Sequence, residues 1–102
     1  MLQYSEVVKT VVVNPIVLED DELNFKIEIL KNSNDEFHAR LFRLETYLVK
    51  PSFVEDIFAD ELQYVLDLHT VPDLTAAYRS SVEDCLQSAL RELEKKFSKQ
   101  SF

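Results

Sequence analysis

The residues of this chain best suited to chemistry are two runs of carboxylates. Residues 19–22 are four consecutive acids. A second acidic region follows Pro51, and no lysine or arginine lies between this proline and Arg79. Its acids are Glu55, Asp56, Asp60, Glu61 and Asp67. Carboxylates gathered in this way attract cations and basic protein surfaces, so both regions are candidate binding sites.

Residues 19–22 offer the oxygen ligands that Ca²⁺ prefers, of which it takes about six to eight. The run lacks the alternating acids and the glycine of an EF-hand loop. The competing interpretation is a solvated loop whose charge prevents pairing at a sheet edge. A calcium-responsive protein that binds the ion at residues 19–22 is therefore an alternative prediction.

The second acidic region predicts a surface for a basic protein partner, with four residues making the contact: Glu55, Asp56, Asp60 and Glu61. The competing interpretation is solubility alone. The chain holds 19 acidic and 11 basic side chains and has a formal net charge of -8. Because phosphate backbones and anionic membranes are bound through Lys and Arg, we expect neither nucleic acid nor a membrane as a partner.

Enzyme chemistry has little support in the sequence. Asp67 precedes His69 by two residues, and His38 is the other histidine. A carboxylate that orients an imidazole is half of a catalytic arrangement, and three side chains are candidate nucleophiles: Ser52, Ser80 and Cys85. The chain contains no glycine, which excludes the dinucleotide fingerprint, the P-loop and the nucleophile elbow. We predict no enzyme and no cofactor, and we keep a histidine-containing pocket as the enzymatic alternative.

The elements that must position these groups follow from the hydrophobic pattern. Residues 5–18 are rich in valine and predict strand, which Pro15 bends, confines to an edge or divides in two. From Leu23 to Ile29 large apolar residues alternate with polar ones, as in a half-buried antiparallel strand. Residues 32–35 predict a turn of asparagine and aspartate, which tolerate a left-handed backbone where glycine is absent.

Residues 36–50 allow both strand and helix. As a strand, their alternation changes phase at Phe42, as a bulge would produce. Four apolar side chains of the same segment fit a helical stripe instead: Phe37, Leu41, Leu44 and Leu48. Aromatic and β-branched residues favour strand, and so does the short connection from the preceding turn. We therefore predict a strand.

Residues 52–68 also carry two signals. Ser52 and Glu55 resemble a capping box, which favours helix. The end of the segment alternates as a strand would. We predict a short helical turn that leads into a strand at about residues 61–68.

The C-terminal segment predicts a long amphipathic helix. Its apolar residues recur at helical spacing: Tyr78, Val82, Cys85, Leu86, Ala89, Leu90, Leu93 and Phe97. Either Ser81 with Asp84 or Ser80 with Glu83 supplies a capping box. Acids in the first turn and lysines near the end complement the helix dipole.

Together these elements predict an α+β fold, an antiparallel sheet of three to four strands with the long C-terminal amphipathic helix packed on one face. No linker or repeat interrupts the sequence, so we expect a single domain over residues 1–102. One helix leaves the other sheet face open, and a homodimer would cover it.

With one cysteine, no signal-peptide pattern and no long apolar run, we expect a cytoplasmic location. The sequence thus predicts a small acidic, non-enzymatic protein-interaction module of unknown biological process. No motif specific to a known family accompanies it.

Overall fold

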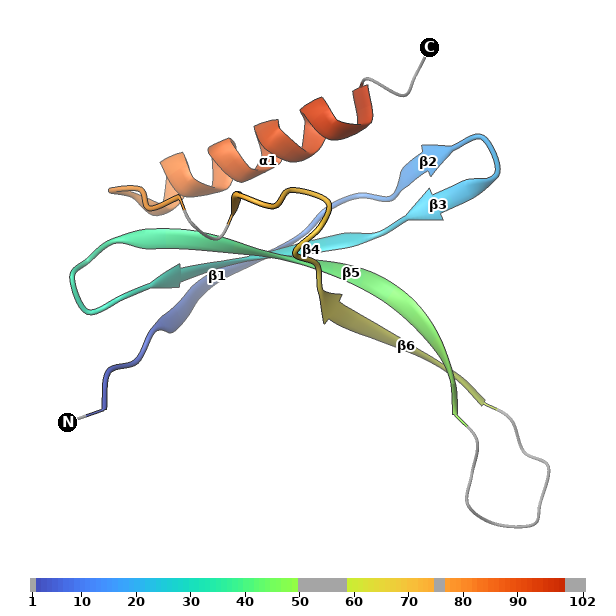
Figure 1. The fold of residues 1–102 in the computed structure, drawn as a ribbon, viewed down its shortest axis with the longest axis horizontal. Coiled ribbons are helices and arrows are strands. Elements are labelled where there is room, and N and C mark those ends of the chain that lie inside the picture. Colours follow the sequence, from blue (N-terminus) through green and yellow to red (C-terminus); the bar gives the residue numbers. More distant parts are fainter. Residues whose placement is uncertain (1, 50–58, 75–76, 99–102) are drawn as a thin grey trace.

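The computed structural model describes residues 2–49, 59–74 and 77–98. Within these residues the order of elements is β1 (Glu6–Val12), β2 (Ile16–Leu18), β3 (Asp21–Leu23), β4 (Phe25–Lys31), β5 (Phe37–Val49), β6 (Ala59–Leu66) and α1 (Val82–Ser98). An antiparallel sheet has the strand order β1-β4-β5-β6, and β2 and β3 form a separate hairpin (Figure 1). The predicted α+β fold is therefore confirmed.

Proline and asparagine divide the first half of the chain. The valine-rich segment is two pieces, because β1 ends at Val12 and β2 begins at Ile16, on either side of Pro15. The predicted strand that starts at Leu23 is also divided, since Asn24 separates β3 from β4. The acidic run therefore forms the end of the β2–β3 hairpin.

The predicted asparagine and aspartate turn lies between β4 and β5. Asn32 Oδ1 accepts hydrogen bonds from the N–H groups of Asn34 and Glu36, at 2.9 and 3.0 Å. Asp35 has φ 59°, in the left-handed region that aspartate tolerates better than most residues. The turn chemistry predicted for a glycine-free chain is confirmed.

The strand prediction for residues 36–50 is confirmed, but the predicted bulge is wrong. β4 pairs without interruption from Phe25↔Arg43 to Lys31↔Phe37, and β6 pairs without interruption from Phe42↔Leu66 to Val49↔Ala59. The alternation of apolar residues in the sequence changes phase for another reason. Neighbouring residues of a strand point to opposite faces of the sheet. Leu41 is buried beneath the helix and Phe42 lies on the other face, so both faces of β5 are apolar there.

A register shift does occur on β1, between Val7 and Lys9. The later ambiguous segment contains β6, which begins at Ala59, two residues before the predicted strand. The helical turn predicted before it falls in residues 50–58, outside the described part of the chain.

The C-terminal helix begins after Ser81, whose Oγ accepts a hydrogen bond from the Asp84 N–H at 3.1 Å. Of the two predicted caps, the structure uses Ser81. Tyr78 was predicted to belong to the apolar stripe of this helix. That prediction is wrong, because Tyr78 precedes the helix and is exposed.

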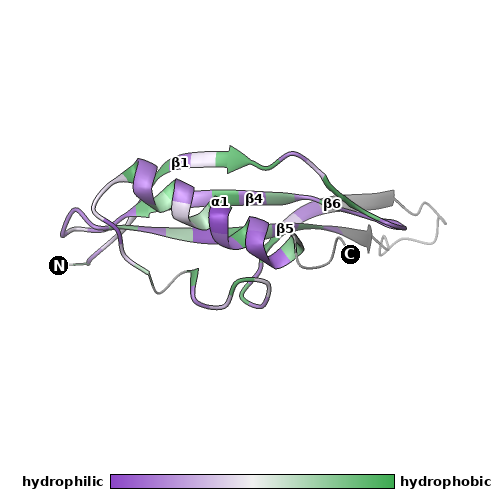
Figure 2. Cartoon of the chain, turned by 90° about the horizontal axis from the view of Figure 1, so that it is seen from above, coloured by the Kyte–Doolittle hydropathy of each residue, from purple (hydrophilic) through white to green (hydrophobic). Residues whose placement is uncertain are grey.

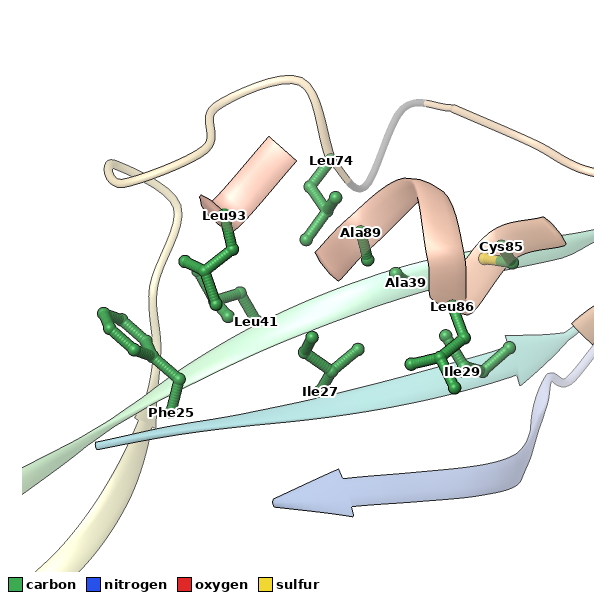
Figure 3. Packing of buried hydrophobic residues seen from close by; sticks show 10 residues of the cluster. All are labelled: Phe25, Ile27, Ile29, Ala39, Leu41, Leu74, Cys85, Leu86, Ala89 and Leu93. Atoms are coloured by element: carbon green, nitrogen blue, oxygen red, sulfur yellow. The ribbon is translucent and has the colours of Figure 1, made fainter. Parts of the chain in front are cut away.

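The helix lies across β4 and β5 (Figure 2) and packs its apolar stripe on their covered face (Figure 3). The buried residues of this core are Phe25, Ile27, Ile29, Ala39, Leu41, Leu74, Cys85, Leu86, Ala89 and Leu93. Within the described residues, no helix is long and apolar enough to cross a membrane.

The sheet is offset along β5. β4 pairs with residues 37–43 of β5, whereas β6 pairs with residues 42–49. The Leu44 N–H still donates to the Asn24 carbonyl, and beyond it β5 pairs with β6 alone. We call this two-stranded part, residues 45–49 paired with 59–63, the β5–β6 arm. It projects away from α1 (Figure 1).

The arm makes the molecule extended. The radius of gyration is 16.8 Å, whereas a compact domain of this length has about 13 Å. The principal extents, 52 × 49 × 19 Å, describe a flat particle. A large part of the chain therefore lies outside the core formed under the helix.

Candidate functional site

Of the four residues predicted to bind a partner, the structure describes two, and both lie on the β5–β6 arm. Asp60 and Glu61 are on β6, paired in register with Leu48 and Tyr47. Glu55 and Asp56 lie outside the described residues. The structure thus brings two of the four predicted residues onto the arm.

The arm carries a strong charge excess. Between Leu44 and Leu66 the sequence contains one basic residue, Lys50. The acids in the same stretch are Glu45, Glu55, Asp56, Asp60 and Glu61. The guanidinium of Arg43, at the base of the arm, pairs with Glu45 and lies 3.8 Å from Asp67 Oδ2. This arginine neutralises the base and leaves the rest of the arm negative.

Asp67 anchors the chain where it leaves β6. Its buried carboxylate accepts hydrogen bonds from the N–H groups of His69 and Thr70, both at 3.0 Å, and from the Thr70 hydroxyl at 2.5 Å. Burial raises the pKa of Asp67, but these hydrogen bonds and the Arg43 charge outweigh it, so the pKa is lowered. The contact with His69 is to its backbone, and this carboxylate therefore holds a turn.

The two histidines differ in environment. His69 is exposed, whereas His38 is buried on β5 with its ring 5.3 Å from the ring of Tyr78. His38 Nδ1 has no hydrogen-bond partner among the described residues. Burial, assisted by the charge of Arg40, lowers the pKa of His38. Neither histidine lines the hollow of about 650 Å³ between the loop after β6 and α1.

Of the three candidate nucleophiles, Ser52 lies outside the described residues, Ser80 is exposed, and Cys85 is buried in the core. Burial raises the pKa of its thiol, which disfavours the reactive thiolate. Its packing role is the one expected for a cysteine on the apolar face of a helix.

The acidic hairpin spreads its carboxylates along two strands. Glu22 is opposite Val17, Asp21 is opposite Leu18, and the turn consists of Glu19 and Asp20. Asp21 Oδ1 accepts the N–H of Glu22 at 2.8 Å. Among the described residues, no group of three or more His, Cys, Asp or Glu side chains is placed to hold a metal ion.

One hollow beside α1 was not predicted from the sequence. It is a hollow of about 650 Å³ between the loop after β6 and the outer side of α1. Arg79 donates to Ser88 Oγ at 3.1 Å within it, and Glu92 lies 3.6 Å from Lys95. The loop is held to the sheet by two backbone hydrogen bonds between Arg79 and Phe37. These contacts hold the loop and the helix in place, so the hollow is explained by how the loop packs beside α1.

The sheet face opposite α1 carries a row of residues that the register aligns across all four strands: Val12, Lys26, Phe42 and Leu66. Lys26 Nζ lies 4.7 Å from the ring centre of Phe42, 4.9 Å from that of Tyr64 and 3.7 Å from Glu28 Oε2. We call this surface the open face, because no helix or strand of the described residues covers it (Figure 1). In the sequence, the apolar residues Phe42 and Leu44 indicated that this face also carries apolar side chains.

Comparison with known proteins identifies a family. The family model described as "Uncharacterised protein YehK" matches residues 5–101. The match spans nearly the whole chain, so the chain belongs to this family. Searches of the curated proteins and of the solved structures found no match.

Proposed function

We propose that this member of the YehK family is a non-enzymatic protein-interaction module whose β5–β6 arm binds a basic protein partner. The observation that carries the proposal is the offset of the sheet along β5. Because β4 stops pairing at Arg43, the arm continues as two strands without a third strand or a helix from the described residues.

Such an arm gains stability from a partner. An isolated pair of strands is marginally stable in water, and a third strand or a packed surface is needed to stabilise it. Within the described residues, each strand of the arm also has an edge without a pairing strand, which favours contact with another chain. A bound partner supplies both the packing and the hydrogen bonds.

The charge of the arm selects the class of partner. The sequence between Leu44 and Leu66 contains five acids and one lysine, and the proposed contacts are made by Glu55, Asp56, Asp60 and Glu61. Opposite charge accelerates the encounter with a basic surface and disfavours acidic proteins and nucleic acid. Since long-range attraction is screened by salt, association should slow as ionic strength rises.

We place the module in the cytoplasm. The single cysteine is buried and its thiol has a raised pKa, which is consistent with a protein that functions without disulfides.

The test compares two charge-reversed variants. The first replaces Glu55, Asp56, Asp60 and Glu61 with Lys. The second is a matched control that replaces all four acids of residues 19–22 with Lys, which changes the net charge by the same amount at the β2–β3 hairpin. Circular dichroism verifies that each variant is folded.

Tagged wild type and both variants are used to capture proteins from a lysate of the native cells, with quantification by mass spectrometry. We expect a basic protein to be retained by the wild type and the hairpin control, and to be reduced at least about tenfold by the arm variant. Equal retention by all three chains, or equal loss from both variants, would contradict the proposal.

A further inference from the structure

We infer that the open face binds a second copy of this chain, so that the protein is a two-fold symmetric dimer with two sheets packed face to face. This inference does not rest on the proposed function. The open-face residues lie under the helix-covered half of the sheet, and none of them belongs to the β5–β6 arm.

The open face has the composition of an interface. Val12 is 63% exposed and Leu66 is 49% exposed, at the two ends of the aligned row. The aromatic rings of Phe42 and Tyr64 both lie close to the Lys26 ammonium, at 4.7 and 4.9 Å from their centres. Aromatic and aliphatic side chains on a sheet face pack well against an equivalent face, as in a β-sandwich.

Lys26 and Glu28 of this face already form an ion pair within one copy. The Lys26 side chain is only 22% exposed, and its ammonium contacts two rings and the carboxylate of Glu28. Burying an unpaired charge is costly, whereas a charge with its partners in place enters an interface at a smaller cost. The ion pair therefore does not prevent this face from being covered.

Charge also identifies the occupant as a second copy. The chain has a formal net charge of -8, so most of its surface repels another copy. The open face is different, because Lys26 and Arg40 flank the single acid Glu28 among the residues that the register places there. A two-fold interface brings the same patch against itself, and a patch that contains both signs is complementary to itself.

The exposed area leaves room for this contact. The chain exposes 7761 Å², whereas a folded monomer of 11.9 kDa exposes about 6,000 Å². Part of the excess of about 1,800 Å² belongs to the projecting arm, and the whole excess is roughly twice the 800 Å² that each partner buries in a standard interface. One such contact on the open face still leaves the arm available for another protein.

Association through the edge of β1 is less favourable than association through the face. The register shift between Val7 and Lys9 interrupts the regular backbone that a pairing strand needs. A bulge and a lysine on an edge strand are devices that discourage edge-to-edge pairing.

The test is the mass of the purified full chain, measured by sedimentation equilibrium at about 100 µM, where a dimer with micromolar affinity is almost fully formed. We expect twice 11.9 kDa for the wild type. Val12→Lys and Leu66→Lys each introduce a charge at an exposed position on the open face and should weaken the dimer at least about tenfold.

Val17→Lys is the matched control, because Val17 is 77% exposed on β2, which belongs to the separate β2–β3 hairpin and not to the four-stranded sheet. It should remain dimeric. All three positions are exposed, so the variants should fold, and circular dichroism with thermal unfolding verifies this. A monomeric wild type overturns the inference, and so does a dimer that Val12→Lys and Leu66→Lys weaken no more than Val17→Lys does.

Discussion

At the scale of single residues, His38 is the buried group most sensitive to pH. Its Nδ1 has no hydrogen-bond partner among the described residues, and Tyr78 covers the ring. The pKa of His38 is lowered from 6.5 by burial first and by Arg40 second. The folded state therefore holds this side chain neutral.

This pKa shift predicts a loss of stability in mild acid. Below pH 6.5 the unfolded chain binds a proton at His38 that the folded chain binds only at lower pH, so the free energy of unfolding should fall as pH decreases from 7. Asp67 affects stability in a separate pH range. Because its pKa is lowered in the folded state, its stabilising contribution is lost as the pH falls below its ordinary pKa of 3.8. Urea unfolding at fixed protein concentration between pH 7 and about 5 measures the slope.

The control for this measurement is the other histidine. His38→Phe should reduce the slope between pH 7 and 5, whereas His69→Gln should leave it unchanged because His69 is exposed. A slope that survives in His38→Phe would show that other groups are responsible.

Asp67 illustrates what residue types alone do and do not predict. Its closeness to His69 in the sequence suggested a carboxylate that orients an imidazole, but the carboxylate binds the backbone of His69 and both donors of Thr70. Aspartate side chains commonly bond to N–H groups two and three residues later in turns. The spacing from Asp67 to Thr70 was thus a signal for a turn.

At the scale of elements, the start of α1 tests the choice between two serines. Ser81 Oγ accepts the Asp84 N–H, whereas Ser80 is exposed and precedes the cap. Ser81→Ala should lower the free energy of unfolding by about 1 kcal/mol, because one helix N–H loses its acceptor. Ser80→Ala should change it by less than about 0.5 kcal/mol. Urea unfolding compares the two, and equal effects would contradict this cap assignment.

The elements were predictable where one side of an element is apolar, as in α1 and β4. β5 was ambiguous because its two sides are apolar in the same region, with Leu41 toward the helix and Phe42 on the open face. Two apolar faces give neighbouring apolar residues, which imitate both a helical stripe and a bulge. Local pattern does not separate these cases, since the answer depends on which strands pair with β5.

At the scale of the whole molecule, the offset between β4 and β6 determines the shape. The sequence predicts an antiparallel sheet of three to four strands, but the offset depends on how far the 13 residues of β5 extend past the 7 of β4. That length difference becomes visible only once the pairing is known. The acidic region was predicted from the sequence, whereas the position of Asp60 and Glu61 on a projecting arm was not.

The offset predicts two levels of stability within one chain. In residues 37–43 β5 is paired with β4 and covered by α1, whereas in residues 45–49 it is paired with β6 alone. Hydrogen exchange of individual amides reports the free energy of local opening, which is lowest where few buried contacts hold the backbone.

Amides of residues 27–29 and 39–41 should exchange only through global unfolding. Hydrogen-bonded amides of the arm should exchange at least about tenfold faster, because the arm opens while the core stays folded. Nuclear magnetic resonance measures both groups in the same sample of the unbound chain. Uniform protection along β5 would mean that the arm shares the stability of the core, and this would remove the energetic argument that a partner stabilises it. If a basic partner binds as proposed, its addition should slow exchange in the arm alone, since the core amides already report global unfolding.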